Sequence, residues 1–155
     1  MEEIKIELTF KRLKTAELSI SERRLFDAAL TASKQAYAPY SHFNVGAAVL
    51  LHDGTVVVGS NQENLAYPSG LCAERVALFS AGASFPQKPV VAIAVIALKN
   101  GEVQPTITPC GACRQVMLET ELRYGQPLGV MLCGKDETIL AASANDLLPL
   151  SFSVF

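Results

Sequence analysis

The chain has 155 residues, of which 50% are hydrophobic and 18% are charged, so it is expected to fold as one domain over residues 1–155. Its 13 lysines and arginines against 15 aspartates and glutamates supply no broad cationic field for a nucleic-acid backbone. The longest apolar run, residues 90–98, is too short to cross a bilayer, and the N-terminus lacks the pattern of a secretory signal. These features predict a cytoplasmic protein with no membrane or nucleic-acid partner. Its four cysteines are then more typical of metal ligands or buried thiols than of disulfides.

The first predicted elements are a strand and a helix. Apolar residues alternate with polar ones over residues 4–10, which predicts a short strand with one buried face. Ser19 followed by Glu22 is a capping-box pattern that predicts a helix start, and Pro39 is expected to end that helix.

The remaining elements alternate in type. Strands are expected at residues 45–51, 55–60, 90–98 and 128–133, with a further candidate at 139–142. Helices are expected at residues 72–83 and 110–122, and a short last helix capped by Asn145. Asp53-Gly54 predicts a hairpin between the second and third strands. One mixed central sheet with helices on both faces, an α/β fold of three layers, fits this order.

The motif Pro109-Cys110-Gly111-Ala112-Cys113 is the first that carries chemistry. Two cysteines three residues apart lie on one side of a helix, within reach of one metal ion. They also lie in its first turn, where the helix dipole favours the thiolate form that binds zinc. Taken alone, the motif is more typical of a redox pair or half of a structural zinc site than of catalysis.

A second motif, Cys72-Ala73-Glu74, lies at another predicted helix start. Alone it is typical of a buried thiol beside a solvated acid. With the first motif it makes three thiolates, and three protein ligands plus water are typical of catalytic zinc. Glu74 is turned away from Cys72 along the helix, so it is free to reach a water or a substrate. Arg75 either offsets the charge of the thiolates or is an ordinary surface arginine, while Cys133, in an apolar run, is expected to be a core thiol.

Together the two motifs resemble the zinc-dependent cytidine deaminases, and cysteine at the first ligand position resembles their free-nucleoside branch. The resemblance covers about residue 20 to the C-terminus. It is carried further by residues 37–48, Asn61-Gln62-Glu63-Asn64, Cys110-Gly111-Ala112-Cys113-Arg114-Gln115-Val116, and Leu147-Leu148-Pro149 with Phe152. It implies a three-layer α/β/α cytidine-deaminase-like fold, in which residues 1–18 are an N-terminal extension without a counterpart.

The resemblance also implies a reaction. This is hydrolytic deamination of cytidine and 2′-deoxycytidine to uridine and 2′-deoxyuridine with release of ammonia, a step of pyrimidine salvage. Cys72, Cys110 and Cys113 would hold one Zn²⁺ per subunit and activate a water, and Glu74 would shuttle protons. Arg75 would bond the zinc thiolates.

The implied substrate-binding residues are Phe43, Asn61, Glu63, Tyr67 and Phe152. Tyr67 and Phe152 would be supplied across subunit boundaries of a homotetramer with shared active sites. From residue type alone, Asn61 also fits a turn, and the three aromatic residues also fit ordinary burial.

Three alternatives stay open. Leu65 stands where the family has a small alanine, which favours a modified or antibiotic aminopyrimidine nucleoside as substrate. Polynucleotide editing is disfavoured by the charge balance and the absence of tryptophan. A zinc-stabilised scaffold would need Cys133, His42 or His52 as a fourth ligand.

Overall fold

A seven-stranded sheet runs through the centre of the molecule in the order β1-β7-β6-β4-β2-β3, with β5 paired to β4. The structure is a computed structural model that describes residues 1–153. The strands are β1 (Phe10–Lys14), β2 (Phe43–Leu51), β3 (Val56–Ser60), β4 (Val90–Lys99), β5 (Glu102–Val103), β6 (Gly129–Cys133) and β7 (Glu137–Ala141). The helices are α1 (Ile20–Ser33), α2 (Ala73–Ser84) and α3 (Gly111–Tyr124), with short 3-10 turns η1 (Thr15–Glu17), η2 (Tyr67–Ser69) and η3 (Ala144–Leu147).

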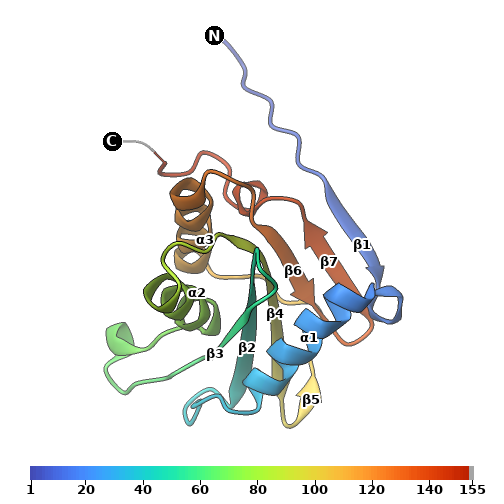
Figure 1. Ribbon diagram of the computed structural model, residues 1–155, viewed down its shortest axis with the longest axis vertical. Coiled ribbons are helices and arrows are strands. Elements are labelled where there is room, and N and C mark those ends of the chain that lie inside the picture. The colour runs from blue at the N-terminus through green and yellow to red at the C-terminus, as the bar shows by residue number, and fades with distance from the viewer. Residues whose placement is uncertain (154–155) are drawn as a thin grey trace.

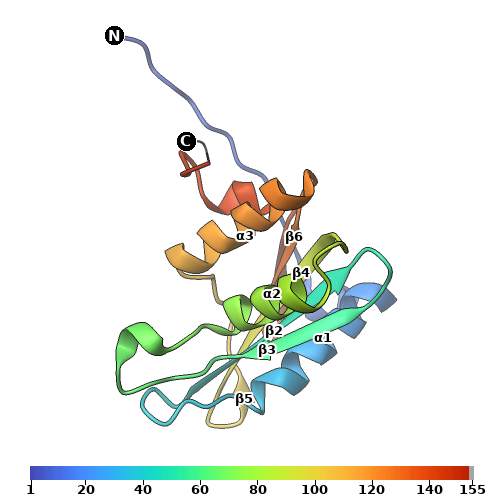
Figure 2. The ribbon, with the colours of Figure 1, turned by 60° about the vertical axis from the view of Figure 1, so that its left-hand side comes forward.

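The sheet is mixed because β4 and β6 are parallel, whereas the other neighbouring strands are antiparallel. A parallel pair needs a long crossover, and α3 lies in the chain between β4 and β6. Helix α1 covers one face of the sheet, while α2 and α3 lie together on the other (Figures 1 and 2). The predicted three-layer α/β/α fold with one mixed sheet is therefore confirmed.

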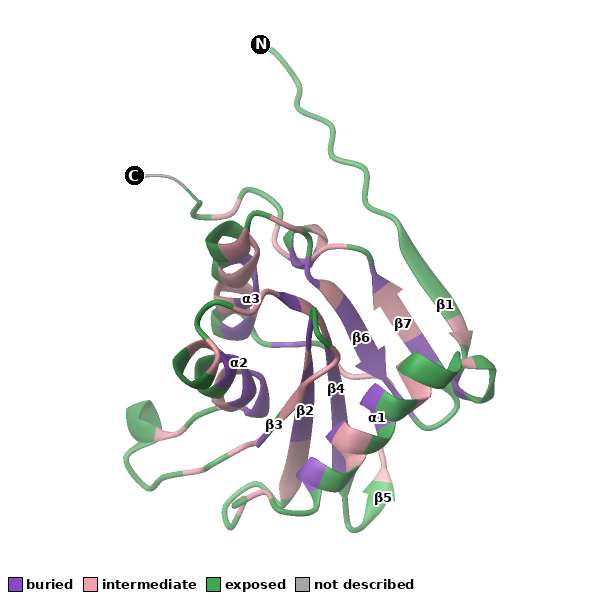
Figure 3. Ribbon diagram, viewed as in Figure 1, coloured by how far each residue is buried: buried purple, intermediate pink, exposed green. Residues whose placement is uncertain are grey.

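The central strand β4 explains why its sequence is apolar without alternation. Ile93 and Val95 pack in the core under α2 and α3, and Ala94 and Ile96 pack in the core under α1. A strand covered on both faces has no polar side, and Figure 3 shows β4 buried along most of its length.

Two strand glycines set the spacing between the layers. A Cβ added at Gly46 of β2 would lie 2.0 Å from the carbonyl oxygen of Ala29 in α1. A Cβ at Gly59 of β3 would lie 2.5 Å from the backbone nitrogen of Ala77 in α2. Any side chain at Gly59 would push α2, and with it the cysteine at its start, away from the sheet.

Most predicted elements are confirmed, including the capping box of α1 at Ser19 and Glu22. The prediction of where the first strand lies was wrong, because β1 spans Phe10–Lys14 and residues 1–9 belong to no strand. The partner strand sets this limit: Phe10 pairs with Ala141, the last residue of β7.

Two helix boundaries also differ from the prediction. Helix α1 ends at Ser33 rather than near Pro39, since Tyr37 donates its backbone N–H to the Asn61 carbonyl and draws the chain towards β3. The last turn is capped by Ser143 rather than Asn145, because the Ser143 hydroxyl accepts the backbone N–H of Asn145. Between residues 1 and 153, no helix combines the length and the apolar character that a membrane span requires.

Candidate active site

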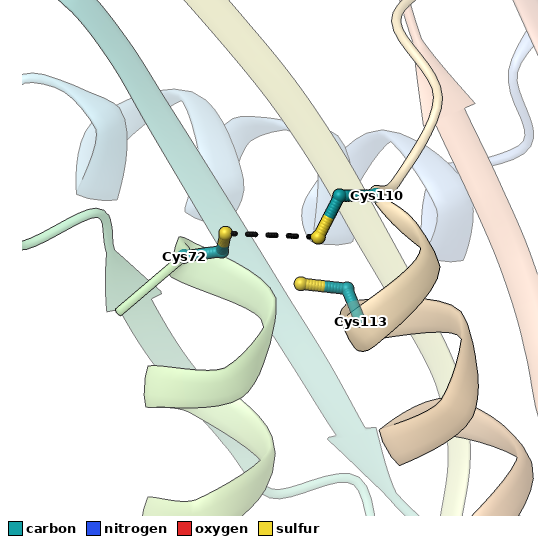
Figure 4. Close-up of side chains that lie close together, drawn as sticks. All are labelled: Cys72, Cys110 and Cys113. Carbon is teal, nitrogen blue, oxygen red and sulfur yellow. Dashed lines mark hydrogen bonds between the residues drawn. The ribbon is translucent and has the colours of Figure 1, made fainter. Parts of the chain in front are cut away.

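Three cysteines meet at the N-termini of two neighbouring helices. Cys72 is the N-cap of α2, Cys110 is the N-cap of α3, and Cys113 lies in the first turn of α3. Their Sγ atoms all lie within 4.8 Å of one another, and those of Cys72 and Cys110 are 4.0 Å apart (Figure 4). The two motifs that are far apart in the sequence thus form one cluster.

The cluster fits a zinc ion. A Zn–S bond of about 2.3 Å in tetrahedral geometry places two sulfurs about 3.8 Å apart, close to the observed spacing. Among residues 1–153 these three cysteines are the only cluster of metal-ligating side chains, and neither histidine belongs to it. Cys133 is buried in the core under α1, on the opposite face of the sheet. The described chain therefore offers three ligands and not the fourth that a zinc-stabilised scaffold would need.

The electrostatics of the sulfurs also favour a cation. Hydrogen bonding to Cys113 lowers the pKa of Cys72 to about 5, and Arg75 acts in the same direction. The interaction with Cys72 and burial raise the pKa of Cys113. One ionised sulfur thus makes it harder for its neighbour to ionise, and a bound cation removes that conflict.

Arg75 lies against the cluster rather than on the open surface. Its Nη2 donates to the Cys72 sulfur over 3.8 Å, and this interaction raises the pKa of the guanidinium. The Nε atom of Arg75 is buried and has no hydrogen-bond partner within the described chain. Its position agrees with the interpretation of Arg75 as a partner of the thiolates.

Glu74 is the one buried charged residue of the described chain, with 4% of its surface exposed. It lies in the first turn of α2, two residues after Cys72. Burial raises its pKa above the ordinary value, and the negative charge of Cys72 adds to that effect. A carboxyl group with a raised pKa beside a metal site is suited to accept and return a proton near neutral pH.

A cleft of about 520 Å³ opens beside Cys72 and Arg75. Three predicted substrate-binding residues line it, namely Asn61, Glu63 and Tyr67. Phe43 and Phe152 are not among its lining residues, and neither is Leu65, which is 78% exposed.

Glu63 is fixed at the rim of this cleft. One carboxylate oxygen accepts the backbone N–H groups of Tyr40, at 2.9 Å, and Ser41, at 3.3 Å, and the other accepts the Ser41 hydroxyl. The hydroxyl bond, followed by that from Tyr40, holds the pKa of Glu63 below its ordinary value. Glu63 is therefore an ionised, oriented acceptor.

The side chain of Asn61, which directly follows β3, is held by strand β2. Its Oδ1 accepts the backbone N–H of Val45 at 2.7 Å, and its Nδ2 donates to the Phe43 carbonyl at 3.0 Å. An amide has two donors and two acceptor lone pairs, so one of each remains for a ligand. Asn61 thus has a structural role at β2, and its amide keeps one donor and one acceptor for a ligand.

The predicted aromatic residues occupy three different places. Phe43 begins β2 and alternates in phase with Val45 and Ala47, which face α2 and α3. Tyr67 is 81% exposed at the cleft, and Phe152 is 64% exposed. The Phe152 carbonyl accepts a hydrogen bond of 2.8 Å from Gln115, which holds the C-terminal segment beside α3. Tyr67 and Phe152 are therefore not core residues of this chain, which was the alternative that their residue type allowed.

The sequence profile of the cytidine and deoxycytidylate deaminase zinc-binding region matches residues 19–126. The chain belongs to this family. It is 40% identical over 129 residues to a cytidine deaminase of Mycobacterium tuberculosis, covering 81% of this chain and 85% of that one. It is 48% identical over 100 residues to a cytidine deaminase of Halalkalibacterium halodurans, covering 64% of this chain and 72% of that one.

Solved structures of cytidine deaminases share its fold. The structure from Burkholderia pseudomallei has a TM-score of 0.71 and 46% identity, over 84% of this chain and 98% of that one. The structure from Mycobacterium tuberculosis has a TM-score of 0.70 and 34% identity, over 88% of this chain and 100% of that one. The family, the enzyme class and the cytidine-deaminase-like fold inferred from the sequence are confirmed.

Further residues, not expected from the sequence, position the groups of the candidate site. Ser41 and the Tyr40 backbone orient Glu63, although the segment around them was part of the resemblance. Arg114 clamps the start of α3 by donating to the carbonyls of Pro109, at 2.9 Å, and Leu147, at 3.0 Å. Apart from the local contact between Arg114 and Pro109, these contacts join segments more than 20 residues apart, so no spacing along the chain signals them.

Proposed function

We propose that this chain catalyses the hydrolytic deamination of cytidine and 2′-deoxycytidine to uridine and 2′-deoxyuridine, with release of ammonia. The observation that carries the proposal is the buried Glu74 beside three clustered cysteines, one of which, Cys72, lines a cleft that also holds an oriented carboxylate. Membership of the deaminase family and the names of the relatives support the same reaction.

Cys72, Cys110 and Cys113 would hold one Zn²⁺ per subunit. The bound ion would supply Lewis-acid activation of a water at the position that its three protein ligands leave open. Arg75, which already donates to the Cys72 sulfur, would offset part of the negative charge of the three thiolates.

Glu74 would move the protons. Its carboxylate would take a proton from the attacking water and deliver it to ring N3 while the C4–O bond forms. It would then pass the second water proton to the amino group, so that the C4–N bond breaks and ammonia leaves. The raised pKa supports this role, because an ordinary exposed glutamate holds a proton too weakly to return it near neutral pH.

Glu63 and the unused donor and acceptor of Asn61 would hold the sugar hydroxyls. An ionised carboxylate accepts only, so Glu63 would fix hydroxyl groups as donors. Phe43 would contact the pyrimidine from the face of β2 that points towards the cluster. Because Glu63 and Asn61 would both bind sugar hydroxyls, a nucleoside is favoured over the free base as the substrate.

The exposed Tyr67 and Phe152 support a homotetramer with shared active sites, in which neighbouring subunits cover these aromatic side chains. Free cysteines at all four positions suit the reducing cytoplasm, where pyrimidine salvage would operate. The family profile begins at residue 19, which supports a single catalytic domain preceded by an extension over residues 1–18.

The test is the ultraviolet absorbance of cytidine and of 2′-deoxycytidine mixed with zinc-loaded protein, with released ammonia measured in parallel. Loss of the cytosine band with an equal amount of ammonia is the expected result. No change for either nucleoside, with zinc present at one ion per chain, would contradict the proposal. Turnover of modified aminopyrimidine nucleosides alone would then favour the second candidate, which Leu65 suggests.

A further inference from the structure

The N-terminal nine residues form an arm that projects away from the body of the molecule (Figures 1 and 2). No strand of the described chain pairs with residues 1–9, and β1 starts only where β7 can receive it, at Phe10. Figure 3 shows the arm exposed along its length. Its backbone donors and acceptors are thus open to another extended chain.

The arm lies outside residues 19–126, the region that the family profile matches. The Burkholderia pseudomallei enzyme is matched over 98% of its own length by only 84% of this chain. None of residues 1–9 lines the cleft beside Cys72 and Arg75, so the arm takes no part in that site.

The pattern of the arm is that of a strand. Ile4, Ile6 and Leu8 are exposed and alternate with Lys5 and Glu7. An ion pair of 2.6 Å joins the Lys5 Nζ to the Glu7 Oε1, so both charges lie on the same side of the extended backbone. One side is apolar and the other is charged, and Ile4, Ile6 and Leu8 remain 82%, 47% and 42% exposed.

We propose that the arm pairs with the arm of a second copy of this chain, as two antiparallel strands over residues 2–10 related by a twofold axis at Ile6. In this register Lys5 faces the partner's Glu7, and the symmetry repeats that pair with the roles exchanged. Ile6 faces the partner's Ile6, and Ile4 faces the partner's Leu8. All three aliphatic residues of both arms then share one side.

The charges disfavour axes at Lys5, Glu7 or Leu8, whereas an axis at Ile4 would pair Lys5 with the partner's Glu3 but place Ile6 against the partner's Glu2. An axis at Lys5 would bring Lys5 against the partner's Lys5 and Glu3 against the partner's Glu7. An axis at Glu7 would oppose two copies of Glu7, and an axis at Leu8 would oppose Lys5 and the partner's Lys11. Like charges directly opposite are destabilising, whereas opposite charges and aliphatic pairs stabilise a two-stranded ribbon. Pairings shifted by a single residue would place aliphatic side chains against charged ones.

A two-stranded ribbon is marginal by itself in water, so the arms would join copies that have bodies to hold them near one another. The surface is self-complementary, as a twofold interface requires. It also covers one of the two backbone edges of each arm.

Cysteine cross-linking tests the register in the zinc-loaded enzyme. Ile6→Cys places two thiols directly opposite each other, so an interchain disulfide should form under mild oxidation at least about tenfold faster than in Ile4→Cys. A mixture of Ile4→Cys and Leu8→Cys should cross-link as Ile6→Cys does. The wild-type holoenzyme controls for its natural cysteines, and unchanged turnover of cytidine shows that the body is intact. Equal rates for Ile6→Cys and Ile4→Cys, or no cross-link in either, would overturn the proposal.

A charge exchange tests the partner. At low salt, Lys5→Glu and Glu7→Lys should each weaken the association measured by sedimentation about tenfold, because each makes two like-charge contacts. Mixing the two variants opposes glutamates to lysines and should restore association between unlike chains. Failure of the mixture to recover would show that the arm does not bind a second arm.

Discussion

Two carboxylates of the same site lie in opposite environments. Glu74, on the first turn of α2, is buried beside sulfurs, and its pKa is raised. Glu63, on the segment that follows β3, accepts bonds from Tyr40 and Ser41, and its pKa is lowered. Environments that push the pKa values of two carboxyl groups apart suit the groups to different roles, and we propose proton transfer for Glu74 and substrate binding for Glu63.

Removal of the zinc that the three cysteines would hold should have the largest effect on turnover. Dialysis against a strong chelator is expected to reduce cytidine deamination below detection, with recovery on adding Zn²⁺, because neither carboxylate activates water alone. Metal content and rate should return in proportion. Full activity in protein shown by elemental analysis to be free of metal would remove the three cysteines from the mechanism.

Replacing Glu74 tests its proposed role in proton transfer. Glu74→Gln keeps the size of the side chain and is not a ligand, so the variant should retain zinc while its kcat falls by at least ~100-fold. Glu63→Gln is the matched control at the rim, where kcat should fall far less. Near-normal turnover by Glu74→Gln would show that the proton moves by another route.

Replacing Glu63 tests the rim. Glu63→Ala should raise KM about tenfold or more while zinc content stays unchanged, because the site loses an oriented acceptor for the sugar. Equal loss of zinc and of nucleoside affinity would mean that Glu63 supports the metal cluster instead.

The rim should also be insensitive to mild acid. A carboxyl group whose pKa is lowered on folding stays ionised above its ordinary value of 4.5 and protonates only as the pH falls further. The KM difference between wild type and Glu63→Ala should therefore stay constant from about pH 7 to about pH 5. A difference that shrinks within this window would contradict the low pKa of Glu63.

Cys133, on the other face of the sheet, should be the cysteine whose replacement affects turnover least. Burial raises the pKa of Cys133 to about 12, so a thiol reagent should leave it unmodified in the metal-free folded protein, while Cys72, whose pKa is lowered to about 5, and the exposed Cys110 react. Denaturation should expose it, and Cys133→Ala should change turnover less than about twofold. Loss of zinc in that variant would place Cys133 in the site after all.

The sequence by itself determined the local parts of this protein. Strands, helix starts and the phase of Cys110 and Cys113 follow from periodicity, caps and helix geometry, each set by residues close together in the chain. The predicted bounds of α1 and β1 were wrong because residues far away in the sequence set them. Asn61 determines where α1 ends, and the end of β7 determines where β1 begins.

Only the tertiary structure decided how the parts meet. In the folded chain Cys72 lies beside Cys110, and Cys133 lies on the opposite face of the sheet. Strand β2 uses one donor and one acceptor of the Asn61 amide. The tertiary structure also buried Glu74 while leaving Glu63 at the rim, a distinction that identical residue types do not encode. Packing of α2 and α3 on one sheet face sets these outcomes, since burial and ionisation depend on neighbours in space rather than along the chain.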